Sequence, residues 1–270
     1  MNICLFTQEE INKPLSLNDV RGKHIVKVLH KKAGDSFVSG IIEGASGISY
    51  IKEINDNSII FDFKPTGDGK PLFPLKMIIG FPRPIQLKRL LRDVAALGVS
   101  EIHLTHTELG EKSYLKSNII ADGGAYKMLL DGTVQAGGTK VPKIFVHESL
   151  RECLKAVEST CQSEKSTFQA GGQSETGPCG HQLKICLDNI SPVGSLSQNV
   201  RKGLSNCSKE GVEPEIIAAI GGERGWTNKE RELFAEKGYI LSGMGNRIMR
   251  TETAATVAGA IILNELGVLN

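Results

Sequence analysis

The sequence lacks three features that would each point to a class of protein. It has no uninterrupted apolar run of the about 18 residues that a membrane span needs. Its first residues, MNICLFTQEEINK, have no basic start followed by an apolar stretch, which argues against a secretory signal. Its six cysteines form no CxxC pair and do not cluster with histidine along the chain, so no metal centre is expected. We expect a cytoplasmic protein with reduced thiols, no membrane association and no bound metal.

An excess of charge of one sign is also absent. The 270 residues include 32 Lys and Arg against 30 Asp and Glu, for a net charge of +2. Many nucleic-acid-binding domains are more basic than this. The total charge therefore neither proposes nor excludes RNA as a partner, because a local basic patch can still bind it.

The first part of the chain has the composition of a small β domain. Four short runs rich in β-branched and aromatic residues, at 3–6, 36–42, 47–54 and 58–64, are separated by Gly, Asn and Asp. Between the first two runs, Asn18 or Asp19 can cap a short helix that carries several basic side chains. These patterns predict a small barrel with one helix. Residues 65–74, with three prolines and two glycines, are predicted to be a linker.

After this linker the pattern changes to alternating strands and helices, which is typical of a mostly parallel α/β sheet. The segment Gln162–His181 is rich in Gly, Ser, Gln and Glu and is predicted to be an exposed loop. Strands are predicted at 75–81, 101–105, 143–146, 183–187, 215–220 and 239–241, and helices at 85–97, 119–135, 150–161, 197–207, 227–237 and 251–266.

The first segment that could carry chemistry follows the apolar run Ile216–Ile220. Gly221, Gly222 and Gly225 lie within five residues, and this density lets the backbone approach a ligand closely. A helix is predicted to start at Thr227, with Glu230 completing a capping box. No Gly-Lys-Ser/Thr follows, so a Walker phosphate loop is excluded. A tight turn without a ligand is the alternative interpretation.

The second segment is the glycine-rich stretch from Leu241 to Arg250. It resembles the start of a dinucleotide fingerprint, but Ile248 stands at the third glycine position, which disfavours a dinucleotide-dependent oxidoreductase. Arg250 stands where the next helix begins, an unfavourable place for a cation unless it holds an anion or pairs with Glu252. Two such loops after strands indicate a small ligand with a flat apolar part and several backbone contacts.

The stretch IGGERGWTNKERELFAEKGYILSGMGNRIMRTETAATVAGAI, residues 220–261, resembles the closing segment of the SPOUT methyltransferases of the RsmE type. In that family the form is approximately IGPEGGFS-x-x-E followed by LG-x-RILRTETA. Shorter similarities lie at 21–29, 96–102, 111–113 and 135–142, so that the resemblance extends over most of the chain. The sequence departs from the family form at Gly222 and Arg224, and His30 replaces a usual arginine.

The resemblance implies an α/β fold in which a PUA-like RNA-binding barrel, residues 1–70, precedes a SPOUT methyltransferase domain, residues 71–270, with a trefoil knot and a parallel sheet. It implies a homodimer that uses S-adenosyl-L-methionine to methylate N3 of a specific uridine in 16S ribosomal RNA of the small subunit. By position, the residues implied to bind the cofactor are Leu187, Gly221, Gly222, Gly225, Leu241, Met244, Gly245, Ile248 and Met249.

Two residues are candidates for catalysis. Arg250 could stabilise the uracil anion that forms when N3 loses its proton, and Glu223 could accept that proton, with Glu252 orienting Arg250. A SPOUT enzyme with a different RNA target and a catalytically inactive RNA-binding relative are the alternatives. Phosphate contacts are predicted for six basic residues, Arg21, Lys23, Lys27, Arg83, Lys88 and Lys112.

Overall fold

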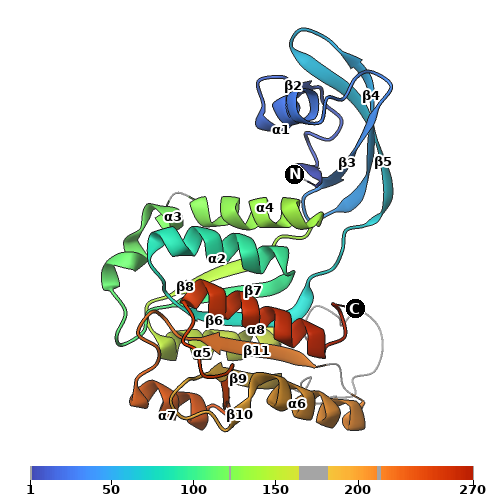
Figure 1. Cartoon of the computed structure of the whole chain (residues 1–270). Helices are drawn as coiled ribbons and strands as arrows, with labels where there is room; N and C mark the ends of the chain where they lie inside the picture. The colour runs from blue at the N-terminus through green and yellow to red at the C-terminus, as the bar shows by residue number, and fades with distance from the viewer. Residues whose placement is uncertain (1, 122, 164–181, 212–213, 270) are drawn as a thin grey trace. The chain divides into compact units, whose positions relative to one another are not determined.

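The computed structural model describes residues 2–121, 123–163, 182–211 and 214–269 (Figure 1). Two compact units can be distinguished: Met1–Leu72 with Leu129–Val141, and Phe73–Met128 with Pro142–Asn270. The predicted division at residue 70 lies next to the first boundary, whereas the assignment of 129–141 to the first unit was not predicted. In the described part, none of the helices has both the length and the apolar character of a membrane span.

The first unit is built on a curled, mixed sheet of five strands in the order β1-β3-β4-β5-β2. Strand β1 runs parallel to β3, and the remaining neighbours are antiparallel. The apolar side chains enclose a core that includes Phe6, Ile25, Phe37 and Ile59. The elements are β1 (Cys4–Phe6), β2 (Leu15–Ser16), α1 (Val20–Lys23), the π-helix η1 (His24–Val28), β3 (Ser36–Ile41), β4 (Ala45–Ile54) and β5 (Ser58–Asp68).

The prediction of a linker over residues 65–74 was wrong at both ends. Strand β5 continues to Asp68, with Pro65 opposite Gly47 of β4, and β6 of the second unit already begins at Phe73. Strand β2 pairs with β5 only at residues 58 and 59. At Pro65, the edge of β5 that faces away from β4 therefore has no partner among the described strands. A proline is tolerated there because its missing N–H would face that open edge.

The second unit is organised around a seven-stranded sheet in the order β10-β12-β9-β11-β6-β7-β8. Every neighbouring pair of strands is parallel, which confirms the predicted parallel sheet. The strands are β6 (Phe73–Gly80), β7 (Val99–Thr105), β8 (Lys143–His147), β9 (Gln182–Leu187), β10 (Gly194–Ser195), β11 (Glu215–Ile220) and β12 (Ile240–Gly243).

Helices lie on both faces of this sheet (Figure 1). Side chains of successive strand residues alternate between the two faces. On one face, Ile78 and Ile217 pack with α5 and α7. On the other face, Met77 lies against Gly259 of α8, which packs beside α2. The helical elements of this unit are α2 (Pro84–Ala96), the 3-10 helix η2 (Lys112–Lys116), α3 (Asn118–Ala121), α5 (Leu150–Ser163), α6 (Leu196–Glu210), α7 (Asn228–Glu236) and α8 (Thr251–Glu265). Helix α4 (Gly124–Ala136) begins in this unit, and from Leu129 onwards it belongs to the first.

One helix prediction is corrected by the structure, and one loop prediction lies mostly outside the described residues. The single helix predicted over 119–135 is divided into α3 and α4, because Gly123 takes a left-handed φ of 68° that a continuing helix does not allow. The loop predicted at 162–181 lies outside the described residues from position 164 onwards, and helix α5 extends to Ser163.

Candidate functional site

Three loops that follow neighbouring parallel strands enclose one cavity of about 550 Å³. They come after β9, β11 and β12, which lie side by side in the sheet, so that the carboxyl ends of these strands meet at one edge. This is where open α/β sheets bind their ligands. The volume lies within the usual range for small-molecule sites.

Eight of the nine residues predicted to bind the cofactor line this cavity; the exception is Leu241. Its carbonyl oxygen accepts a hydrogen bond from the backbone N–H of Val193 at 2.8 Å, and its side chain packs against the core under α5 and α7. Leu241 therefore helps to fix the strand from which the loop after β12 begins.

Glycine is required by the backbone of these loops. Gly225 and Gly245 have φ angles of 68° and 92°, in the region that side chains rarely adopt. A Cβ atom on Gly221 would lie 3.0 Å from the Cα atom of Gly225, so the loop after β11 folds tightly onto itself. The strand-to-helix turn is closed by Thr227 and Glu230, whose side chains form the predicted capping box at the start of α7.

Trp226 connects the loop after β11 to the end of β9. Its buried indole N–H donates to the carbonyl oxygen of Leu187 at 3.1 Å. The ring packs edge-on against Phe234, with 4.8 Å between the ring centroids. Two neighbouring walls of the cavity are thus held in one position.

A buried ion pair fixes the loop after β9. Asp188 accepts from Nε of Arg231 at 2.9 Å and from the backbone N–H groups of Ile190 and Ser191. The Asp188 side chain is 1% exposed, so these partners replace the water that an ionised carboxylate requires. Both residues line the cavity, and neither was predicted from the sequence. The position of Asp188 directly after a predicted strand is the only signal that could have indicated it.

The catalytic candidates differ in their surroundings. Glu223 lines the cavity, and its carboxylate is ion-paired with Nε of Arg83 at 3.1 Å. Arg250 is exposed between two lining residues, Met249 and Thr251, and among the described residues its guanidinium has no hydrogen bond or ion pair. Glu252 is buried in the first turn of α8, and the structure does not pair it with Arg250.

The comparisons with known proteins agree on one family. The RNA methyltransferase domain family matches residues 69–263. Ribosomal RNA small subunit methyltransferase E of Treponema pallidum is 41% identical over 267 residues, covering 97% of this chain and 91% of that protein. The chain belongs to this family. Methyltransferase E 1 of Borreliella burgdorferi, another member, is 32% identical over 98% of this chain and 99% of its own length.

Solved structures of methyltransferases share the fold. A methyltransferase from Legionella pneumophila in complex with S-adenosylmethionine has a TM-score of 0.68 at 17% identity, covering 98% of this chain and 97% of that one. Methyltransferase E of Neisseria gonorrhoeae, bound to the same molecule, has a TM-score of 0.66 at 17% identity and the same coverage. These similarities confirm the predicted fold class of the methyltransferase E family.

The basic residues predicted to contact RNA fall into two groups. The guanidinium of Arg21 is held within its own unit by Asp19, Glu10 and the carbonyl oxygen of Leu5, at 2.8 to 3.1 Å, and these neighbours raise the pKa of Arg21. Arg83 is engaged by Glu223. The remaining four, Lys23, Lys27, Lys88 and Lys112, are exposed.

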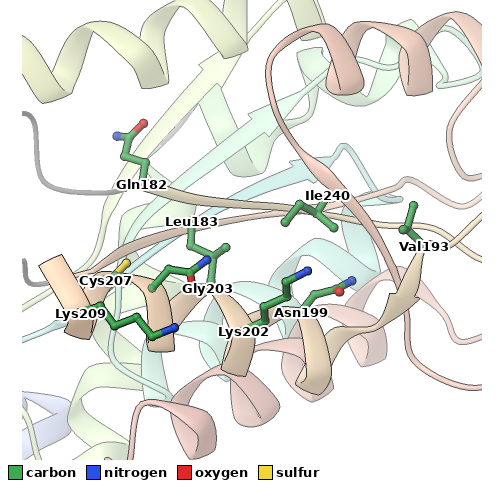
Figure 2. A pocket seen from close by; sticks show the side chains of 10 residues that line it. Gln182, Leu183, Val193, Asn199, Lys202, Gly203, Cys207, Lys209 and Ile240 are labelled. Atoms are coloured by element: carbon green, nitrogen blue, oxygen red, sulfur yellow. The ribbon is translucent and has the colours of Figure 1, made fainter.

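A second cavity, of about 510 Å³, lies between α6 and the strands β9 and β12 (Figure 2). Lys202 and Lys209 extend from α6 along its side, and Leu183 and Ile240 come from the amino-terminal ends of their strands. None of the predicted site residues lines it. Because ligands of parallel sheets bind at the carboxyl ends of strands, the cavity between the three loops is the better candidate for the site.

Proposed function

We propose that this chain transfers a methyl group from S-adenosyl-L-methionine to N3 of a specific uridine in 16S ribosomal RNA. The observation that carries the proposal is the cavity formed by three loops in a member of the methyltransferase E family. The two related structures named above were solved with S-adenosylmethionine bound. The uridine and its N3 atom come from the resemblance in sequence and are the finer part of the proposal.

The residues around the cavity fit such a ligand. Leu187, Ile220 and Met244 offer apolar surface for a flat ring, and the glycine backbone allows close approach without side chains in the way. Asp188 and Arg231 neutralise each other, so neither presents an uncompensated charge. When bound, the cofactor supplies a methyl group on a sulfonium, which needs alignment with the attacking atom more than chemical activation.

In the proposed reaction Arg250 acts on the uridine. Arg250 lies between two residues that line the cavity. Its guanidinium, which has no partner among the described residues, can donate to O2 or O4 of the base, where negative charge develops as N3 loses its proton. Glu223 is the proposed acceptor of that proton. Its ion pair with Arg83 is exposed on both sides, 60% and 36%, and such pairs cost little to open.

The proposed contacts with ribosomal RNA come from Lys23 and Lys27 in the first unit and from Lys88 and Lys112 in the second. All four are exposed and can neutralise phosphate groups. The first unit is thus proposed to bind RNA and the second to carry out the transfer. We further propose that the enzyme acts as a homodimer, as the resemblance implies.

Calorimetric titration with S-adenosylmethionine tests the cofactor site. Gly245→Ala should weaken binding at least about tenfold, since a φ of 92° strains any side chain and displaces the loop after β12. Gly34→Ala is a matched control: Gly34 has a φ of 91°, also with open space around a new Cβ, but lies in the first unit. Absence of binding to the unmodified chain would instead favour an RNA-binding relative without catalysis.

Mass analysis of 16S ribosomal RNA from a deletion strain tests the target. We expect 3-methyluridine to be lost at one position and restored by the intact gene, but not by a gene carrying Arg250→Ala. Unchanged 3-methyluridine, with loss of a different methylated nucleotide, would contradict the uridine N3 assignment and support a SPOUT enzyme with another RNA target.

A further inference from the structure

A chain of buried polar side chains crosses the second unit, away from the three loops. Nζ of Lys76 on β6 lies 3.6 Å from the carboxylate of Glu101 on β7 and 2.9 Å from that of Glu215 on β11. Glu101 contacts Nε2 of His103 at 3.1 Å, and Nδ1 of His103 lies 3.0 Å from Nε2 of His147 on β8. All of these polar side chains except that of Glu215 are buried.

A buried thiol lies beside the two histidines at one end of this series of polar side chains. Cys153, in the first turns of α5, is fully buried, and its Sγ atom lies within 4.8 Å of one ring nitrogen of each histidine. His103 and His147 are 1% and 6% exposed. The three side chains come from two neighbouring strands and the helix that covers them, so the fold alone brings them together.

Two imidazole nitrogens and one thiolate form a donor set that favours zinc over calcium or magnesium, which bind oxygen. Tetrahedral zinc places its nitrogen ligands about 3.3 Å apart. Nδ1 of His103 and Nε2 of His147, 3.0 Å apart, share a hydrogen bond that the cation would replace by a turn of the two rings. We propose that His103, His147 and Cys153 form a site for a zinc-class divalent cation and supply three of its ligands.

Glu101 prepares His103 for this role. With its Nε2–H donated to the Glu101 carboxylate, His103 keeps a lone pair on Nδ1, the atom that faces Nε2 of His147. Metal-bound histidines usually donate their second N–H to a carboxylate in this way, which fixes the orientation of the ring. Phe145 stacks on the same ring, with 4.7 Å between the centroids, and restricts it further.

The charges balance when the cation is present. The cation carries two positive charges, which the thiolate of Cys153 and the carboxylate of Glu101 cancel, while Lys76 and Glu215 neutralise each other. Cysteine binds such a cation as a thiolate, so the proton of the Cys153 thiol passes to solvent when the cation binds. Binding therefore forms two metal–nitrogen bonds and one metal–sulfur bond, moves the Nε2 proton of His147 to its Nδ1, and releases the thiol proton to solvent.

The proposed site would fasten α5 to the outer strands of the sheet. Strand β8 is the edge of the seven-stranded sheet, and His147 is its last residue, which gives a cation a short path from solvent. No metal was expected from the sequence, because the six cysteines form no CxxC pair and do not cluster with histidine along the chain. The proposal revises that expectation and does not depend on the reaction that the chain catalyses.

Cobalt is the probe that tests the site, since it replaces zinc and reports its ligands by absorption. The full chain, treated with a chelator and dialysed, is titrated with Co²⁺ and then with Zn²⁺. We expect a thiolate-to-cobalt charge-transfer band and visible tetrahedral bands that saturate at one equivalent and disappear on addition of zinc. A chain that develops neither band would overturn the proposal.

Two cysteine variants identify the sulfur. Cys153→Ser should lose the charge-transfer band, whereas Cys186→Ala, a buried thiol in the same core but outside the group, should keep it. Circular dichroism verifies that both variants are folded. A heat-unfolding series supplies a second measurement: Zn²⁺ should raise the Tm of the unmodified chain and of Cys186→Ala, but not of Cys153→Ser. Equal behaviour of the two variants would refute the assignment of Cys153.

Discussion

Arg21 in the first unit and Arg250 in the second stand near the start of helices, yet their surroundings are opposite. The Arg21 guanidinium is bound by two carboxylates and a carbonyl oxygen and lies over the Phe6 ring, 5.0 Å from its centroid. The Arg250 guanidinium is exposed and without a partner among the described residues. An arginine whose N–H groups are all hydrogen-bonded within the protein stabilises the fold. One whose N–H groups are free beside a cavity can bind a substrate.

The largest expected effect comes from Arg250. Arg250→Ala should lower the rate of methyl transfer about 10²- to 10³-fold, as loss of a donor to developing charge commonly does. The free energy of unfolding of this variant should change by less than about 0.5 kcal/mol, because the Arg250 side chain has no partner among the described residues. Single-turnover assays with ribosomal RNA and urea unfolding measure the two quantities. If Arg250→Ala instead destabilised the chain strongly, the contrast with Arg21 would fail.

Replacement of Arg21 should have the opposite effect: it should lower the stability of the first unit and leave cofactor binding unchanged. Arg21→Ala removes a cation from two carboxylates and is expected to destabilise the first unit by about 2 kcal/mol, the range for hydrogen bonds to charged groups. Binding of S-adenosylmethionine to the second unit should be unchanged. Hydrogen exchange of the β1 and β3 amides measures the first effect, and calorimetry measures the second. An Arg21→Ala chain with normal exchange and weak RNA binding would place Arg21 with the phosphate-binding residues after all.

The exposed lysines near Arg21 should affect RNA binding alone. Lys23→Ala combined with Lys27→Ala is expected to reduce the slope of log K against log salt by about 1.4 to 1.8, depending on whether the two phosphates contacted belong to single-stranded or double-stranded RNA. Lys13→Ala with Lys52→Ala, exposed lysines of the same unit, provide a control at equal change in charge. Equal slopes for both double variants would remove the specific role of Lys23 and Lys27.

The smallest expected effect is on stability at low pH. Hydrogen bonds from Arg21 lower the pKa of Glu10 and of Asp19 from their ordinary values of 4.5 and 3.8. Their stabilisation is complete above these values and is lost as the pH falls through the lowered ones, because the unfolded chain then binds more protons. Unfolding by urea, followed by circular dichroism between neutral pH and about pH 3, should show a shallower decline for Arg21→Met than for the unmodified chain.

Local patterns predicted much of this molecule. The capping box of Thr227 and Glu230 lies within four residues and predicts the start of α7. The glycines around 221 and 245 predict their loops in the same local way. The parallel sheet followed from the alternation of strands and helices. These features could be predicted because each depends on neighbours in the sequence.

Features that depend on distant partners could not be predicted. Asp188 meets Arg231 across 43 residues, and His103 meets His147 across 44. A single sequence contains no sign of either pairing. Arg21 was assigned to RNA because a basic residue in a basic segment resembles a phosphate ligand, whereas Glu10, 11 positions earlier, holds it in place.

The position of Trp226 has a practical consequence, since it is the only tryptophan in the chain. Its ring is 3% exposed and forms part of the wall between the loops after β9 and β11. The intrinsic fluorescence of the protein therefore originates beside the candidate site, in a dry environment that shifts emission to the blue. Binding of a molecule in the cavity would change this emission, so occupancy of the site can be followed by intrinsic tryptophan fluorescence without a label.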